Sequence, residues 1–130
     1  MAYRVEFTDD AKVDLRGVRS ARAKAQIREA LERLEREGPC IGVRLRGLGR
    51  THFCRLAVPE HAKNKWRIVY EWPPPSDQPQ DLIWIWVVRE HTEQPETDVY
   101  LWLDVLIQRK GSVVEPWSAG EPRRRCCGQS

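Results

Sequence analysis

The N-terminal segment begins with the period-two alternation of a half-buried strand, which extends over residues 3–7. Thr8 can then cap a helix, because a threonine side chain accepts a hydrogen bond from the free backbone amides of a first helical turn. Asp9 and Asp10 fall in that turn, near the positive end of the helix dipole. We expect this helix to end near Gly17–Ser20.

Apolar residues at helical spacing predict a second helix that ends at Gly38-Pro39. Its apolar face consists of Ala23, Ile27, Ala30, Leu31 and Leu34. The first helix has a matching stripe of Ala11, Leu15 and Val18. Glycine readily ends a helix and proline cannot continue it. The two helices are therefore expected to form a hairpin with one apolar surface.

Beyond Pro39 the period-two alternation returns, which predicts strands. The first signal comes from Val43 and Leu45 and continues in residues 52–58. In residues 52–58 one face holds Cys54, Leu56 and Val58. Arg55 lies on the other face and is expected to point away from the core.

Residues 65–72 alternate in the same way. The set predicted to face inward is Trp66, Ile68, Tyr70 and Trp72, and the set predicted to face outward is Arg67, Val69 and Glu71. Arg67 is thereby expected on the same type of exposed face as Arg55. A run of three prolines, at residues 73–75, ends this strand.

Residues 81–89 are apolar on both faces, which is typical of a central strand. Thr97 can cap a last helix that ends at Lys110. The resulting order, strand–helix–helix–strand–strand–strand–helix, predicts one α+β domain over residues 1–111. Residues 112–130 are expected to be a loosely ordered tail.

Length and composition fit one domain in the cytoplasm. A chain of 130 residues with 41% hydrophobic residues and six tryptophans can bury one core of modest size. No apolar run approaches the ~20 residues of a membrane helix, and the N-terminus lacks the pattern of a signal peptide. In a reducing compartment we expect four thiols, which are Cys40, Cys54, Cys126 and Cys127. Their spacing does not indicate a zinc site.

The net charge of +3 conceals a basic block and an acidic block. Residues 44–67 contain one acid, Glu60, against Arg44, Arg46, Arg50, Arg55, Lys63, Lys65 and Arg67. Residues 71–104 contain eight acids against only Arg89. The first block could bind a polyanion and the second would limit how tightly it binds. The alternative is an ordinary solvated surface of charged side chains.

Several short motifs, in this order, resemble the RelE/ParE toxin family over roughly residues 3–110. They are Tyr3-Arg4-Val5-Glu6-Phe7-Thr8 leading into Ala11, Leu31-x-x-Leu34 before Gly38-Pro39, Leu45-Arg46-Gly47-Leu48-Gly49, Phe53-Cys54-Arg55-Leu56, Trp66-Arg67-Ile68-Val69-Tyr70, Val87-Val88-Arg89 and Tyr100. Each motif is common by itself, and the resemblance rests on their order and spacing. It implies a helical hairpin packed on a small, mostly antiparallel sheet with a C-terminal helix.

The resemblance also implies a toxin of a type II toxin–antitoxin system that cleaves mRNA on the ribosome without a metal or another cofactor. In RelE-like members the 2′-hydroxyl of the substrate attacks, so the protein must stabilise a pentavalent phosphorane and move protons. The resemblance places Arg67 and Arg89 at the positions of catalytic arginines, and Arg55 is a third candidate. Guanidinium groups bind phosphate oxygens bidentately and stay charged at any working pH.

His91 and Tyr100 are the candidates for proton transfer. The ordinary histidine pKa of about 6.5 suits either a general acid or a general base. His91 follows Arg89 by two residues. His52 and His61 are the other histidines. A solvated loop histidine and a core tyrosine are the ordinary alternatives. Contacts with RNA or the ribosome are assigned to the basic block, through Arg44, Arg46, Arg50, Lys63 and Lys65.

The last predicted helix is apolar on nearly every side. Only Asp104 interrupts the run Val99, Tyr100, Leu101, Trp102, Leu103, Val105, Leu106 and Ile107. A surface helix usually buries one stripe of about 100°, so we expect a second stripe that exposes Trp102 or Leu106. The resemblance supplies a partner, an antitoxin encoded nearby whose amphipathic segment lies in a groove. Its expected contacts are Tyr100, Trp102, Leu103 and Leu106.

Two other functions are open from the sequence. A ParE-like toxin that binds DNA gyrase shares this fold and needs no catalytic groups, and the acidic block suits it better. The three arginines and the basic block favour RNA. A third alternative is that the acidic segments have disarmed the site and left an antitoxin-binding or autoregulatory remnant.

Overall fold

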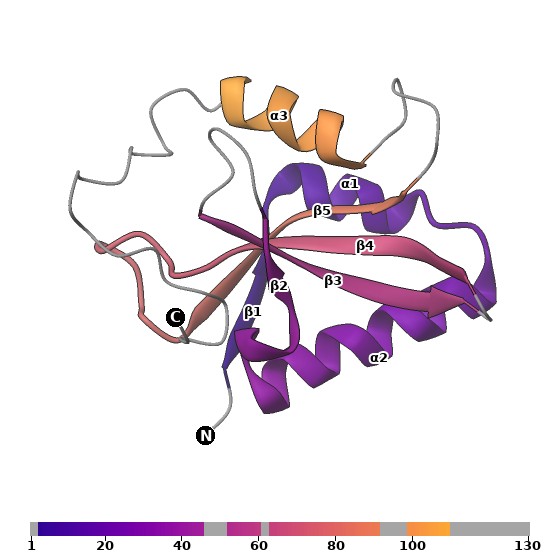
Figure 1. Ribbon diagram of the computed structural model, residues 1–130, viewed down its shortest axis with the longest axis horizontal. Coiled ribbons are helices and arrows are strands. Elements are labelled where there is room, and N and C mark those ends of the chain that lie inside the picture. Colours follow the sequence, from indigo (N-terminus) through magenta and orange to yellow (C-terminus); the bar gives the residue numbers. More distant parts are fainter. Residues whose placement is uncertain (1–2, 46–51, 61–62, 92–98, 110–130) are drawn as a thin grey trace.

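A computed structural model describes residues 3–45, 52–60, 63–91 and 99–109, which form a five-stranded sheet with helices on both faces (Figure 1). The strands are β1 (Arg4–Phe7), β2 (Val43–Arg44), β3 (Phe53–Glu60), β4 (Lys63–Glu71) and β5 (Leu82–Glu90). The helices are α1 (Asp9–Arg16), α2 (Ala21–Glu37) and α3 (Val99–Arg109), and the 3-10 turn η1 (Pro39–Ile41) follows α2. The strand order is β1-β5-β4-β3-β2, in which β1 and β5 run parallel and the other described pairs run antiparallel. The expected α+β fold with a mostly antiparallel sheet is confirmed.

The ends of the N-terminal helices follow from capping groups in the sequence. Thr8 Oγ1 accepts a hydrogen bond from Ala11 N at 3.1 Å, which is the predicted cap. In the same way, Ser20 Oγ accepts a hydrogen bond from Ala23 N at 3.1 Å at the start of α2. Gly38 ends α2 with a left-handed φ of 88°. The predicted helical hairpin and its end at Gly38 are confirmed.

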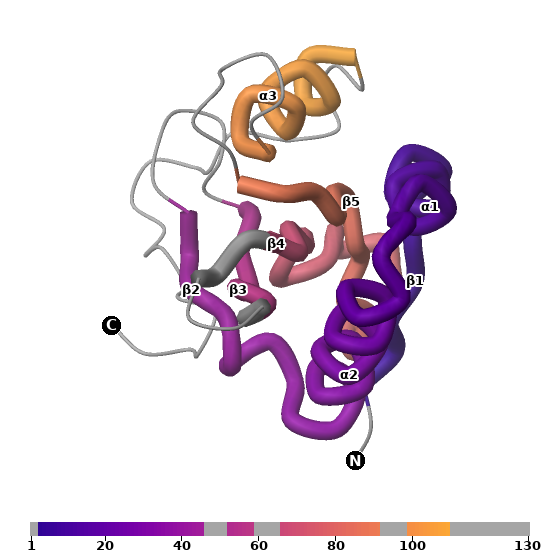
Figure 2. Tube along the Cα trace, turned by 90° about the vertical axis from the view of Figure 1, so that its right-hand side faces the viewer, coloured from indigo at the N-terminus to yellow at the C-terminus, as the bar shows by residue number. Residues whose placement is uncertain are grey.

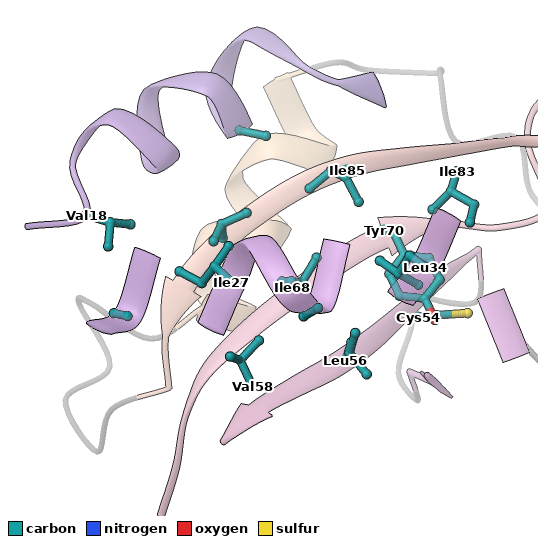
Figure 3. Close-up of a cluster of buried hydrophobic side chains, with 14 residues drawn as sticks. Val18, Ile27, Leu34, Cys54, Leu56, Val58, Ile68, Tyr70, Ile83 and Ile85 are labelled. Carbon is teal, nitrogen blue, oxygen red and sulfur yellow. The ribbon is translucent and has the colours of Figure 1, made fainter. Parts of the chain in front are cut away.

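One face of the sheet, here called the α2 face, is covered by α1 and α2 and holds the larger core (Figures 2 and 3). Fully buried side chains from α2, β4 and β5 meet there, among them Ile27, Leu34, Ile68, Tyr70, Ile83 and Ile85. Burial of one such aliphatic side chain contributes about 1.5–3 kcal/mol. The set predicted to face inward in residues 65–72 belongs to this core.

The Tyr70 side chain ties the turn before β2 to this core. Its hydroxyl donates a hydrogen bond to the Pro39 carbonyl at 2.8 Å. A Cβ atom at Gly42 would lie 1.9 Å from the same hydroxyl oxygen. Only glycine therefore allows the chain to pass this close to Tyr70 on its way into β2.

The opposite face, here called the α3 face, carries a second core beneath α3. The α3 residues Val99, Leu103 and Leu106 are buried there with Phe53, Val69, Trp86 and Val87 of the sheet. The prediction that Val69 and Glu71 point outward to solvent is wrong. Val69 is fully buried, and the buried Glu71 accepts a hydrogen bond from Trp86 Nε1 at 3.1 Å. Alternation separates the two faces of a strand, but it does not reveal that a distant helix covers the second face.

Two further differences concern β2 and the cysteines. Val43 and Arg44 pair with β3 as a short strand of their own, so four strands follow the helical hairpin and not three. Cys54 is disulfide-bonded, which corrects the expectation of four thiols, whereas Cys40 is exposed and is not part of a disulfide. Compartment and spacing along the chain, on which that expectation rested, do not reveal which sulfur atoms meet in space.

Several expectations fall on residues outside the described ranges. They concern Cys126 and Cys127, the helix ends at Thr97 and Lys110, and the tail of residues 112–130. Among the helices that the structure describes, none has both the length and the apolar character needed to cross a membrane.

Candidate functional site

Three arginines lie on the α3 face of adjacent strands, and we call them the arginine row: Arg55, Arg67 and Arg89. Arg67 of β4 is directly opposite Arg89 of β5. Arg55 of β3 pairs with Val69, which is two residues from Arg67 along β4, so all three side chains point to the same face. Directly opposite residues in antiparallel strands have Cβ atoms about 4.5–5.5 Å apart. The expectation that Arg55 and Arg67 share a face is confirmed, and the register adds Arg89.

A β-bulge in β5 brings Arg89 to this face. The pairing of β4 with β5 skips Trp86. One extra residue in a strand reverses the facing of every residue that follows it. Without the bulge, Arg89 would lie on the α2 face with Ile83 and Ile85. The bulge therefore sets Arg89 beside Arg67.

Asp14 of α1 holds Arg89 at the edge of the sheet. The pairing of β1 with β5 ends at Ile85, and α1 packs against β5. Asp14 Oδ2 accepts a hydrogen bond from the backbone N of Val88 at 3.1 Å, and Oδ1 accepts one from Arg89 Nε at 3.1 Å. The Asp14 side chain is only 4% exposed, whereas that of Arg89 is 35% exposed. One carboxylate thus satisfies an edge amide and pairs with an arginine.

The charge on Asp14 is opposed by its surroundings. Burial has the largest effect and raises the pKa of the Asp14 carboxyl above its ordinary value of 3.8, and the nearby charge of Asp10 acts in the same direction. The hydrogen bond from Val88 and the charge and hydrogen bond of Arg89 lower this pKa without offsetting the burial. The Asp14 carboxylate therefore pairs with Arg89 although burial removes the water that would otherwise stabilise its charge.

The α3 helix adds an aromatic ring to the same guanidinium group. Arg89 Cζ lies 4.3 Å from the centroid of the Trp102 ring, and Arg109 Cζ lies 5.1 Å from it. Such cation–π contacts contribute about 0.5–1 kcal/mol at exposed sites and more when desolvated. The Arg89 side chain is therefore held by an acid from α1 and by a ring from α3.

The two residues predicted for proton transfer contact each other. The rings of His91 and Tyr100 are 5.4 Å apart between centroids, with an interplanar angle of 64°. His91 is exposed directly after β5, and Tyr100 is half-buried in the first turn of α3. His52 lies elsewhere, before β3, where its carbonyl accepts a hydrogen bond from Trp72 N. His61 is outside the described residues.

The basic block does not form one surface in the described part of the chain. Arg44 lies in the strand position opposite Cys54, whose side chain belongs to the α2 face. Its guanidinium is half-buried and donates a hydrogen bond to the Trp72 carbonyl, and burial lowers its pKa. The structure thus separates Arg44 from the arginine row. Arg46, Arg50 and the side chains of Lys63 and Lys65 lie outside the described residues.

The α3 residues predicted to contact an antitoxin fall into two groups. Leu103 and Leu106 are fully buried against the sheet, so the prediction that Leu106 is exposed is wrong. The reason is that the second core beneath α3 buries the helix stripe for which the sequence alone indicated no partner surface. Tyr100 and Trp102 are half-buried, with Tyr100 against His91 and Trp102 against Arg89. The exposed apolar side chains of α3 are instead Leu101 at 43% and Val105 at 39%.

A cleft of about 390 Å³ adjoins the arginine row on the side of α1. It is lined by Val13, Asp14, Gly17, Trp66, Val88, Arg89 and Glu90. Trp66 and Glu90 are cross-strand partners next to the pair formed by Arg67 and Arg89. Arg89 therefore belongs to the arginine row and also lines this cleft.

Sequence reasoning missed Asp14. Asp14 is three residues after Ala11 and four before Val18, so it falls within the apolar stripe of the first helix. A buried acid needs a charged or hydrogen-bonding partner, so an acid at a position of the apolar stripe indicates a paired residue. The partner, Arg89, is 75 residues away, and periodicity does not identify it.

Comparison with known proteins identifies the family. Residues 5–95 match the family described as ParE toxin of type II toxin-antitoxin system, parDE. This match spans most of the chain, which therefore belongs to the ParE toxins of type II toxin–antitoxin systems, within the RelE/ParE superfamily. A comparison with curated protein sequences found no match.

Two solved structures have a similar fold. A chain of the toxin–antitoxin complex RelBE2 from Mycobacterium tuberculosis is 23% identical with a TM-score of 0.52, over 70% of this chain and 93% of that chain. The isolated RelE toxin of E. coli is 16% identical with a TM-score of 0.54, over 83% of this chain and 99% of that chain. At these identities the likeness concerns the fold alone.

Proposed function

We propose that this toxin cleaves messenger RNA on the ribosome and that Arg67 and Arg89 bind the scissile phosphate. The observation that carries the proposal is the direct pairing of Arg67 with Arg89, with Arg55 on the same face of the next strand. Like charges directly opposite each other destabilise a sheet, and a bound phosphate would relieve that repulsion. The planar guanidinium fork also matches phosphate oxygens in geometry.

The reaction that suits these groups is transfer of a phosphate within the RNA backbone. The 2′-oxygen loses its proton and attacks phosphorus, and the 5′-oxygen leaves with a proton, which gives a 2′,3′-cyclic phosphate and a 5′-hydroxyl end. Arg67 and Arg89, with Arg55 as a third group, would stabilise the charge on the pentavalent phosphorane. The proposed proton-transfer groups are His91 and Tyr100. His91 is exposed at the end of β5, where a substrate can reach it.

A second candidate function is inhibition of DNA gyrase by binding. The ion pair of Asp14 with Arg89 favours this second function, because it offsets one of the positive charges that would bind phosphate in RNA cleavage. The family model that matches the chain is also named for ParE. A gyrase-binding toxin would need no phosphate clamp, so the two functions differ in their dependence on the arginine row.

We also propose an antitoxin partner that lies along α3. The RelBE2 chain with a similar fold was solved in a toxin–antitoxin complex. Leu101 and Val105 are four residues apart, so they lie on one side of α3, and both are exposed. An amphipathic segment of the antitoxin could bury this pair. A toxin that acts on ribosomes would be cytoplasmic.

Cell-free translation separates the two candidate functions. The chain is added to ribosomes that translate a defined mRNA, and the RNA ends are mapped by primer extension, with supercoiling by purified gyrase measured in parallel. Cuts that carry cyclic phosphate ends and appear only with ribosomes are expected. Inhibited gyrase with intact mRNA would select the second candidate. The absence of both effects would indicate the disarmed remnant.

A further inference from the structure

We infer that the buried Asp14 carboxylate is a positioning residue for cleavage, and that it aims the two Nη groups of Arg89 at the scissile phosphate. This inference rests on the proposed function. Asp14 itself is covered by the fold, since its side chain is 4% exposed. It acts through Arg89, which is the more accessible member of the pair.

The Asp14 carboxylate is fixed against rotation because each of its oxygens has its own donor. Oδ2 accepts a hydrogen bond from Val88 N, and Oδ1 accepts one from Arg89 Nε, both at 3.1 Å. Val88 precedes Arg89 in the same strand. The acid is therefore anchored to the backbone that carries the arginine, and it cannot move without breaking one of the two bonds.

The ion pair leaves the outer part of the guanidinium group available. Asp14 engages Nε, and within the described residues neither Nη nitrogen of Arg89 has a hydrogen-bond partner. The guanidinium group is planar and rigid, so fixing Nε and the plane also fixes the direction of both Nη groups. The Trp102 ring lies against the guanidinium group as well, with its centroid 4.3 Å from Arg89 Cζ. Nε is thus engaged by Asp14 and the guanidinium carbon lies over Trp102, and the Nη edge can meet a phosphate.

A charged residue is a costly way to bind the amide of Val88. Burial raises the pKa of Asp14, so the carboxylate is less favourable here than in water. A neutral acceptor could satisfy Val88 N without that penalty. The benefit of the charge lies with Arg89. The same charge weakens the attraction of Arg89 for phosphate. Removing the charge should therefore loosen the orientation of the Arg89 guanidinium group and strengthen its affinity for phosphate.

Asp14→Asn separates these two effects. Asparagine keeps one acceptor for Val88 N and removes the charge. We expect kcat for mRNA cleavage on the ribosome to fall on the order of 10- to 100-fold, because a misdirected catalytic group costs about this much, while KM stays equal or decreases. The matched control is Asp10→Asn, which makes the same change one turn earlier on α1. This control should leave both constants as in the wild type. Equal kcat in Asp14→Asn and wild type would overturn the inference.

NMR of the arginine side chains tests the positioning without cleavage. In the wild type, Arg89 Nε–Hε should exchange slowly with water compared with exposed Arg28 on α2, and Asp14→Asn should remove this difference. An Arg89 signal as labile as that of Arg28 in the wild type would overturn the inference, even if the variant does not fold. If the wild type shows protected Arg89 but cleaves no mRNA, the proposed function fails, and the role of Asp14 in cleavage is overturned with it.

Discussion

On the α2 face of the sheet, the alternate residues from Trp66 to Trp72, in β4 and directly after it, all belong to one apolar core, whereas the α3 face carries an apolar core and, at its border, the arginine row. The difference follows from the helices that cover them. The 17 residues of α2 extend about 25 Å and the 11 residues of α3 only about 16 Å, against about 30 Å for the nine residues of β4. Core residues such as Phe53 and Val69 lie beneath α3. The arginine row lies at the border of that core, where Arg55 pairs with Val69.

Under the proposed function, stability and chemistry are divided between the two faces of the same strands. Ile68 and Arg67 are neighbours in β4, yet Ile68 belongs to the core under α2 and Arg67 to the arginine row. Substitutions of adjacent residues should therefore have separate effects. Four predictions test this division, beginning with the largest expected effect.

Ile68→Ala should lower the free energy of unfolding by roughly 2–5 kcal/mol, because it leaves a cavity in a well-packed core. Ile68 is fully buried. Urea unfolding, followed by circular dichroism, measures the change. A loss below about 1 kcal/mol, smaller than the usual cost of such a cavity, would mean that the α2 face is not the main source of stability.

Arg67→Ala should lower mRNA cleavage by roughly 100-fold or more, because removing one preorganised charge from a developing oxyanion costs about 3 kcal/mol. Its free energy of unfolding should change by less than that of Ile68→Ala, since Arg67 is half-buried whereas Ile68 is fully buried. Single-turnover cleavage on stalled ribosomes measures the rate. Arg28→Ala, an exposed change on α2, is the control. Wild-type cleavage by a folded Arg67→Ala protein would remove the arginine row from the mechanism.

Leu101→Gln should weaken antitoxin binding by about 1 kcal/mol, the scale of a contributing interface residue, and leave the stability of the free chain unchanged. Leu101 is 43% exposed on α3. Val13→Gln on α1, at 60% exposed, is the matched control. Isothermal titration with the cognate antitoxin measures both variants. Equal losses in the two variants would mean that the antitoxin does not prefer α3.

The smallest expected effect is a pH dependence that comes from Asp14. Because the folded state raises its pKa above 3.8, its contribution to stability is fully present below that pH and is lost as the pH rises through the folded pKa. Asp14→Asn lacks this titration. The stability of the variant relative to the wild type should therefore increase from about pH 3.5 toward pH 7. Urea unfolding at several pH values measures the difference. A relative stability that decreases over this range would contradict the sign of the shift.

Most of the fold could be predicted from local patterns. The caps at Thr8 and the end of α2 at Gly38 depend on residues close in sequence, and the structure confirms both. Periodicity also separated the two sides of β4. It could not show that Val69 and Glu71 are buried, because their cover is α3, a helix from another part of the chain.

Less of the candidate site than of the fold could be predicted from the sequence. Arg55 and Arg67 could be placed on one face by alternation alone. Arg89 joins them only through the bulge at Trp86, and no residue type in that apolar run marks where the extra residue falls. Asp14 was visible as an acid in an apolar stripe, but its partner was not. A prediction from periodicity thus finds the strands, and the register of one against another decides which charges meet.

The parallel pairing of β1 with β5 also determines when the arginine row can form during synthesis. Asp14 is 75 residues before Arg89 in the chain, and β1 pairs with Leu82–Ile85 of β5. During synthesis β1 and α1 leave the ribosome long before β5 exists, and closing so long a loop is slow compared with local hairpin formation. The β3–β4 hairpin can form early, but it carries only Arg55 and Arg67. A nascent chain therefore has no complete arginine row until β5, which carries Arg89, has left the ribosome.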